Sequence, residues 1–100
     1  MKPVTKQEAF QYDPVALNAD TDKRRNNIKI FEDTITKEKQ AIERDLYIIS
    51  QIDEKHPDVA KLKETIQKIK TNLKTFEEAI QNEKEEIKRD LDMIAIINAN

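Results

Sequence analysis

Residues 28–53, IKIFEDTITKEKQAIERDLYIISQID, decide the fold, because residues 73–98, LKTFEEAIQNEKEEIKRDLDMIAIIN, nearly repeat them 45 positions later. Twelve of the 26 paired positions are identical, which is far above chance even for a chain rich in Lys, Glu and Ile. An internal repeat defines the structural unit of a chain before any other pattern does. The unit here is one long amphipathic helix that the chain uses twice.

The apolar residues of both copies recur at steps of three and four, which places them along one face of a helix. In the first copy these residues are Ile28, Phe31, Ile35, Ile42, Leu46, Ile49 and Ile52. Each copy interrupts the stripe with a Glu-Lys pair, at 38–39 and at 83–84, and resumes it with a four-residue step to Leu46 or Leu91. We expect a stutter at this point, which locally unwinds a supercoil.

Pro57 divides the two copies into separate helices. Proline disfavours helical geometry at the preceding His56, but it fits the first position of a new helix. We expect a first helix over about 20–54 with Asp20, Thr21 or Asp22 as its N-cap, a turn at 55–57 and a second helix over about 57–98. So short a turn makes the helices antiparallel. The numbers of facing residues should then add up to about 111, which places the basic cluster 23–25 beside Glu85 and Glu86.

Residues 1–19 differ from the rest of the chain because they contain two of its three prolines and show no sustained helical period. We expect an extended N-terminal arm. It could include one short turn at Asp13-Pro14, where Asp13 could cap and Pro14 could occupy the first helical position.

The composition points to an all-α protein, a long antiparallel helical hairpin of the coiled-coil type that assembles into a helical bundle. Charged residues make up 38% of the chain and are nearly balanced, with 18 basic against 20 acidic side chains and no glycine. Apolar residues at helical spacing among so many charges are typical of coiled coils.

No pattern of catalytic, cofactor-binding or metal-ligating residues is present in the sequence. His56 is the single histidine and there is no cysteine, so a zinc site has no ligand set. Carboxylates at helical spacing alternate with lysines, as in the surface ion pairs Asp33/Lys37, Glu64/Lys68 and Glu85/Arg89. We therefore expect no enzyme and no cofactor, and we interpret His56 as a turn residue.

Membrane and nucleic-acid partners are not favoured. No apolar run is long enough to span a bilayer, and the start of the chain lacks the apolar stretch of a signal peptide. A basic cluster at 23–25 could follow a phosphate backbone, but the pI of about 5.5 and the acidic neighbours oppose it. We expect a cytoplasmic or virion-associated protein.

A long hairpin buries only one seam, so something else should cover apolar surface. The stripe widens at the end of each copy, which suggests contact with two neighbours. Three covers are open: a second hairpin placed head to tail, the N-terminal arm folded back on 91–97, or a foreign protein. The candidate interface residues are Phe10, Tyr12, Leu46, Tyr47, Ile48, Ile49, Ile52, Leu91, Met93, Ile94, Ile96 and Ile97.

These patterns favour a non-enzymatic structural, scaffold or assembly protein that forms a homo-oligomer, with a dimer preferred, and presents its arm to a protein partner. One alternative is a monomeric inhibitor or adaptor that binds through an exposed face at 91–97. A second alternative is a nucleic-acid-binding accessory protein.

Overall fold

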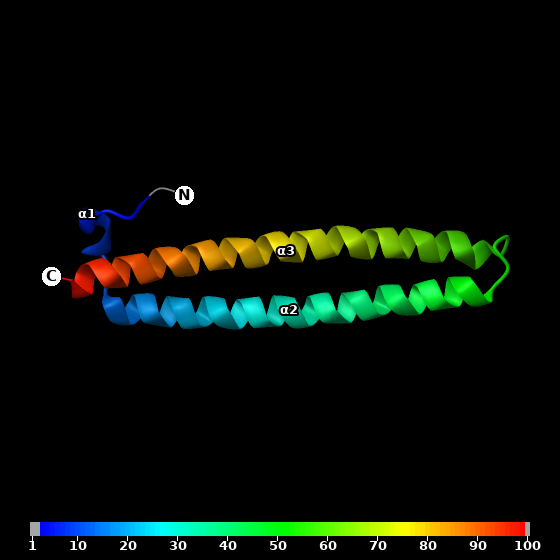
Figure 1. Cartoon of the computed structure of the whole chain (residues 1–100), viewed down its shortest axis with the longest axis horizontal. Helices are drawn as coiled ribbons and strands as arrows, with labels where there is room; N and C mark the ends of the chain where they lie inside the picture. Colours follow the sequence, from blue (N-terminus) through cyan, green and yellow to red (C-terminus); the bar gives the residue numbers. More distant parts are fainter. Residues whose placement is uncertain (1–2, 100) are drawn as a thin grey trace.

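The computed structural model describes residues 3–99 and consists of two long antiparallel helices preceded by a short one (Figure 1). α1 spans Lys6–Ala9, α2 spans Pro14–Gln51 and α3 spans Pro57–Asn98. The molecule measures 69 × 21 × 14 Å, so it is a rod little thicker than one helix in its shortest dimension. The predicted all-α helical hairpin is confirmed.

The first long helix begins earlier than expected, at Pro14 rather than near residue 20. The Asp13 side chain accepts a hydrogen bond from the Val15 amide over 3.0 Å and so caps the helix, with Pro14 at its first position. The expected N-cap Thr21 is instead a helix-interior residue and is buried. The arm is therefore shorter than 1–19 and itself contains α1.

The turn between the helices comprises residues 52–56, slightly before the expected 55–57. The Asp53 carboxylate accepts a hydrogen bond from the Lys55 amide, and the Asp53 carbonyl accepts one from the His56 amide. His56 has extended backbone geometry and its Nδ1 accepts from the Asp58 amide over 3.1 Å, which caps α3. The interpretation of His56 as a turn residue is confirmed.

The observed register agrees with the prediction to within one helical turn. The numbers of Thr21 and Asp90, which face each other, add up to 111, whereas those of Arg24 and Glu83 add up to 107. Of the three predicted surface pairs, Glu64–Lys68 forms at 3.5 Å, whereas Arg89 pairs with Glu8 of α1.

The stutter prediction was wrong, because the seam keeps its regular alternation of three- and four-residue steps. Glu38 and Asp45 occupy the seam of α2, half-buried, while Leu46 is 53% exposed. Glu83 and Asp90 take the same places in α3, and Leu91 is 43% exposed. The repeat therefore conserves two acidic seam positions and places its leucine outside the seam.

The two copies of the repeat are related by a pseudo-two-fold axis through the middle of the hairpin. Phe31 and Phe76 are equivalent residues, and their ring centroids lie 6.1 Å apart at an interplanar angle of 33°. Equivalent residues of two antiparallel helices can meet only where such an axis passes. The ends of α2 and α3 therefore carry equivalent surfaces at opposite ends of the rod.

Candidate interaction surfaces

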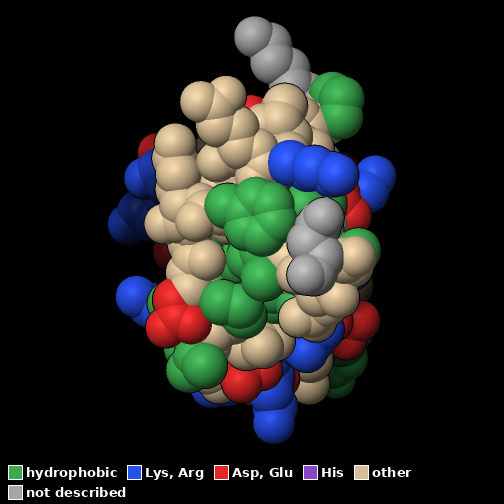
Figure 2. Space-filling view, turned by 90° about the vertical axis from the view of Figure 1, so that its left-hand side faces the viewer, with side chains coloured by type: hydrophobic (Ala, Val, Ile, Leu, Met, Phe, Trp, Pro, Cys, Tyr) green, Lys and Arg blue, Asp and Glu red, His purple; other side chains and the backbone are tan. Residues whose placement is uncertain are grey.

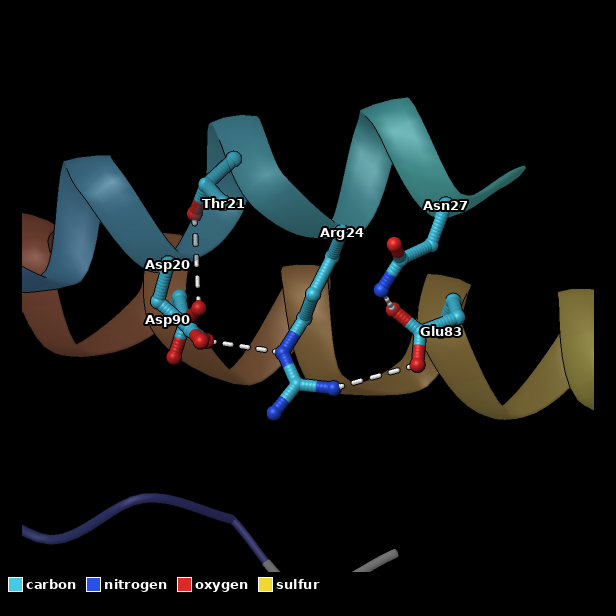
Figure 3. Close-up of polar contacts among 6 residues, drawn as sticks. All are labelled: Asp20, Thr21, Arg24, Asn27, Glu83 and Asp90. Atoms are coloured by element: carbon cyan, nitrogen blue, oxygen red, sulfur yellow. Dashed lines mark hydrogen bonds and ion pairs between the residues drawn. The ribbon is translucent and has the colours of Figure 1, made fainter. Parts of the chain in front are cut away.

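A buried polar layer joins α2 to α3 near the α1 end of the rod. Thr21 is 2% exposed, and its hydroxyl donates a hydrogen bond to Asp90 Oδ2 over 3.4 Å. Asp90 is 6% exposed and lies beside the Asp20 carboxylate (Figure 3). Burial, together with the Asp20 carboxylate, raises the pKa of Asp90 from its usual 3.8 to about 6. Hydrogen bonding to Asp90 and to Arg24 lowers the pKa of Asp20.

Arg24 connects this layer to the next turn of α3. Its Nε donates to Asp20 over 2.7 Å and its Nη1 donates to Glu83 over 3.3 Å (Figure 3). Asn27 also donates to Glu83, over 3.4 Å. Among the described contacts, Arg24 is the residue of the basic cluster that reaches α3, and its partner is Glu83 rather than the expected Glu85 or Glu86. Arg25 pairs with Asp22 of its own helix over 3.9 Å, and Lys23 and Arg25 are exposed.

The end of α3 is covered by the N-terminal segment, which we define as residues 3–12. Ala9 is fully buried between Leu17 and Met93, which are 5% and 2% exposed. Val4 packs against the same cluster, as do Ile94, Ile96 and Ile97. Figure 2 views this end of the rod and shows hydrophobic side chains gathered at its centre with charged ones around them.

An ion pair fixes the N-terminal segment at its edge. Arg89 Nη2 of α3 donates to Glu8 Oε2 of α1 over 3.0 Å, with both side chains partly exposed. Glu8 precedes Ala9, so one short helix supplies both the carboxylate and the small apolar residue. Of the three covers considered above, the folded-back arm is the one that this structure contains.

None of the described residues 3–99 covers the equivalent surface at the turn end in this way. The 45-residue offset relates Arg89 to Arg44, Met93 to Ile48, Ile97 to Ile52 and Leu17 to Leu62. Ile48 is 44% exposed, against 2% for Met93. The Arg44 side chain makes no hydrogen bond or ion pair with any residue of the described range 3–99. We call the residues Arg44, Ile48, Ile52 and Leu62 the turn-end groove.

Exposed apolar side chains extend from this groove around the outside of α2. Leu46 is 53% exposed and Tyr47 is 67% exposed, and both adjoin Ile48 in the sequence. Successive residues of a helix point about 100° apart, so these three side chains cover most of the helix surface outside the seam. We call Leu46, Tyr47 and Ile48 the turn-end patch.

The predicted interface residues therefore separate into three groups. The turn-end patch, Phe10, Tyr12 and Leu91 are exposed, and Ile49 and Ile52 are half-buried. Met93 is buried inside the chain, and Ile94, Ile96 and Ile97 pack around it. The large apolar side chains expected on an exposed face at 91–97 are therefore buried or half-buried, apart from Leu91. Val4 and Ala9 of the N-terminal segment cover this face together with Leu17 of α2, while Phe10 and Val15 are exposed.

Sequence reasoning missed α1 and its buried residue Ala9, although a signal was present. Thr5 and Glu8 have the spacing of a capping box, and the Thr5 hydroxyl accepts a hydrogen bond from the Glu8 amide over 3.2 Å. Nothing comparable marked Thr21, because its burial depends on α3 lying opposite.

Within residues 3–99, no three acidic or histidine side chains are grouped so that they could hold a metal ion. No described helix has a segment apolar and long enough to cross a bilayer.

Comparisons with protein families, with curated proteins and with solved structures found no match to this chain. The fold defines the class of two-helix antiparallel hairpins, and the exposed surfaces of this hairpin are its candidate functional sites.

Proposed function

We propose that this protein is a non-enzymatic structural or assembly component that self-associates and binds a protein partner. The observation that carries the proposal is the turn-end patch, in which three consecutive large apolar side chains are 44–67% exposed. Exposed apolar clusters of this kind, bordered by charged residues, mark protein–protein contacts. As such a component, the protein would work in the cytoplasm or in a virion.

The shape of the molecule supports the same proposal. A rod 69 Å long and 14 Å thin has little interior, so most of its apolar side chains are only half-buried. A second hairpin packed alongside would convert part of this half-buried surface into the core of an antiparallel four-helix bundle. The repeat favours a dimer, since a two-fold contact uses the same patch on both chains.

Sedimentation equilibrium of the purified full chain tests the proposal. We expect a mass that rises above the 11.7 kDa of the monomer as the concentration increases. The double variant Leu46→Asp/Tyr47→Asp should return the mass to that of the monomer, because both charges would be buried in the contact. Ile30→Asp is the matched control, since Ile30 is 53% exposed on α2 but lies outside the patch.

A concentration-independent monomer would contradict self-association. A monomer that binds a partner through the patch would instead be an adaptor, the alternative considered above. An equal effect of Ile30→Asp on the mass would show that the patch is not the contact.

A further inference from the structure

We propose that the turn-end groove is a docking site for a short helix of another protein, which carries a carboxylate directly before a small apolar residue. The chain itself displays the ligand chemistry, because its own α1 occupies the equivalent surface at the other end of the rod. This proposal does not depend on self-association, which is tested through the outward-facing Leu46 and Tyr47, although Ile48 belongs to both surfaces.

The two surfaces match at the positions that contact Glu8 and Ala9, although Gln51 stands where the covered surface has Ile96. Ala9 of α1 lies against Leu17 and Met93, whose equivalents are Leu62 and Ile48. Glu8 pairs with Arg89, whose equivalent is Arg44. The groove thus has the arginine and the apolar walls of a site that is occupied at the other end of the same molecule.

The turn-end groove is open, whereas α1 covers part of its counterpart and leaves a cavity of about 280 Å³ beside Leu17, Arg89 and Met93. A cavity of about 420 Å³ lies at the turn end, and its lining includes Ile48 of α2, Ile52 of the turn, and Leu62 and Thr65 of α3. A second, wider groove of about 790 Å³ continues along α2 past Arg44, Tyr47 and Ile48. A bound helix would cover Ile48 as α1 covers Met93.

The charges around the groove fit an acidic ligand. Arg44 has no partner among the described residues, and Lys37 and Lys61 line the two adjoining cavities. The acidic side chains in the same linings are Glu43 and Asp58. A carboxylate beside the Arg44 guanidinium would form a charge-assisted hydrogen bond of the kind that Glu8 forms with Arg89.

The chain's own N-terminal segment cannot fill this groove. Ile48 lies 34 residues along α2 from Pro14, a distance of about 50 Å at 1.5 Å per residue. Twelve residues span at most about 40 Å when fully extended. The N-terminal segment of a second copy is already bound to its own α3 and would have to leave that site to bind here. We therefore assign the occupant to another protein.

A peptide titration tests the proposal with the full chain. The probe is a synthetic peptide with the sequence of residues 3–12, added to isotope-labelled protein and followed by amide resonances. We expect saturable shifts of residues 44–52 and 58–65. Arg44→Glu should weaken the affinity for the peptide about tenfold, because one charge-assisted hydrogen bond is lost. A Glu8→Arg peptide should restore binding to that variant, because the two charges are exchanged. Lys29→Glu is the control, because it makes the same charge change on an exposed part of α2.

Three results would overturn the proposal. The first is the absence of shifts at millimolar peptide, and the second is equal binding to Arg44→Glu and to the unchanged chain. The third is a set of shifts at residues 44–52 that appears without peptide as the protein is concentrated and disappears in Glu8→Arg protein. That result would identify the segment of a second copy as the occupant. A Leu46→Asp/Tyr47→Asp variant that loses only self-association would not contradict this proposal.

Discussion

Asp90 shows how one residue can have different roles in the two copies of the repeat. Its carboxyl is buried against Thr21 and Asp20, while the equivalent Asp45 is half-buried and makes no hydrogen bond or ion pair within the described chain. The register places Ile66 opposite Asp45, whereas Thr21 faces Asp90. A buried carboxyl beside a second carboxylate favours its protonated form, because two close negative charges repel each other.

The Asp90 carboxyl should make the stability of the hairpin depend on pH. Its pKa is raised to about 6, so the stability it contributes is complete below its usual 3.8 and is lost as the pH rises through 6. The lowered pKa of Asp20 acts in the opposite sense, and its contribution is lost only as the pH falls below 3.8. We therefore expect thermal stability to decrease between pH 4.5 and pH 7.5.

Asp90→Asn should abolish this decrease and raise the free energy of unfolding at pH 7.5 by about 2 kcal/mol, because an amide keeps the hydrogen bond from Thr21 without the charge. Thermal melts followed by circular dichroism measure both effects. Asp45→Asn is the matched control and should keep the pH dependence of the unchanged chain. A melting temperature of Asp90→Asn that still falls over this range would show that other groups cause it.

At the scale of elements, α1 has an effect far larger than its four residues suggest. It is too short to be stable alone, but Thr5 caps it, Ala9 is buried in the end of the hairpin and Glu8 pairs with α3. The end of α3 is therefore buried by a segment that lies more than 80 residues earlier in the sequence. At the turn end the chain reverses directly from α2 into α3 through residues 52–56 and supplies no such segment.

Ala9→Asp should detach the N-terminal segment, because it places an unpaired charge at a position that is 0% exposed. We expect α2 and α3 to remain helical while the melting temperature falls by several degrees and dye binding to apolar surface increases. Circular dichroism and dye fluorescence measure these changes. Phe10→Asp, at an adjoining residue that is 54% exposed, should change neither quantity. An Ala9→Asp chain with unchanged melting would show that α1 contributes no stability.

At the scale of the whole molecule, the pseudo-two-fold axis organises the rod. Phe31 and Phe76 meet at this axis, so each half of the hairpin places its acidic seam residues and its wide apolar end at the same distance from the centre. Within residues 3–99 the symmetry is broken at the ends, because a chain segment covers one end and none covers the other. The uncovered end is the surface for which we propose a partner.

A double-mutant cycle on the two phenylalanines tests whether their contact holds the centre of the rod. Phe31→Ala and Phe76→Ala should each lower the free energy of unfolding by about 2 kcal/mol, less than for fully buried rings because both are half-buried. The double variant should lose less than the sum by about 0.5–1.5 kcal/mol, the usual coupling of an aromatic pair. Denaturant unfolding measures all three. Strict additivity would indicate that the rings do not interact in solution.

Much of the fold could be predicted from local patterns. The repeat, the helical spacing and Pro57 predicted two antiparallel helices, and the charges predicted their register to within one turn. The start of α2 could not be placed correctly, because the polar stretch 18–27 carries no apolar rhythm and is held in the helix by contacts with Glu83 and Asp90. The seam position of Asp45 was missed for a related reason, since a leucine next to an aspartate is ordinarily the buried member of the pair.

The sequence by itself determined that this protein is a helical hairpin with an internal repeat, because spacing and a proline act through the local geometry of the backbone. The tertiary structure decided which of the two equivalent surfaces is covered and which carboxyl is buried. These outcomes depend on residues that are more than 60 positions apart, Ala9 with Met93 and Thr21 with Asp90. Contacts over such distances follow from how the whole rod is assembled, and no short stretch of sequence contains them.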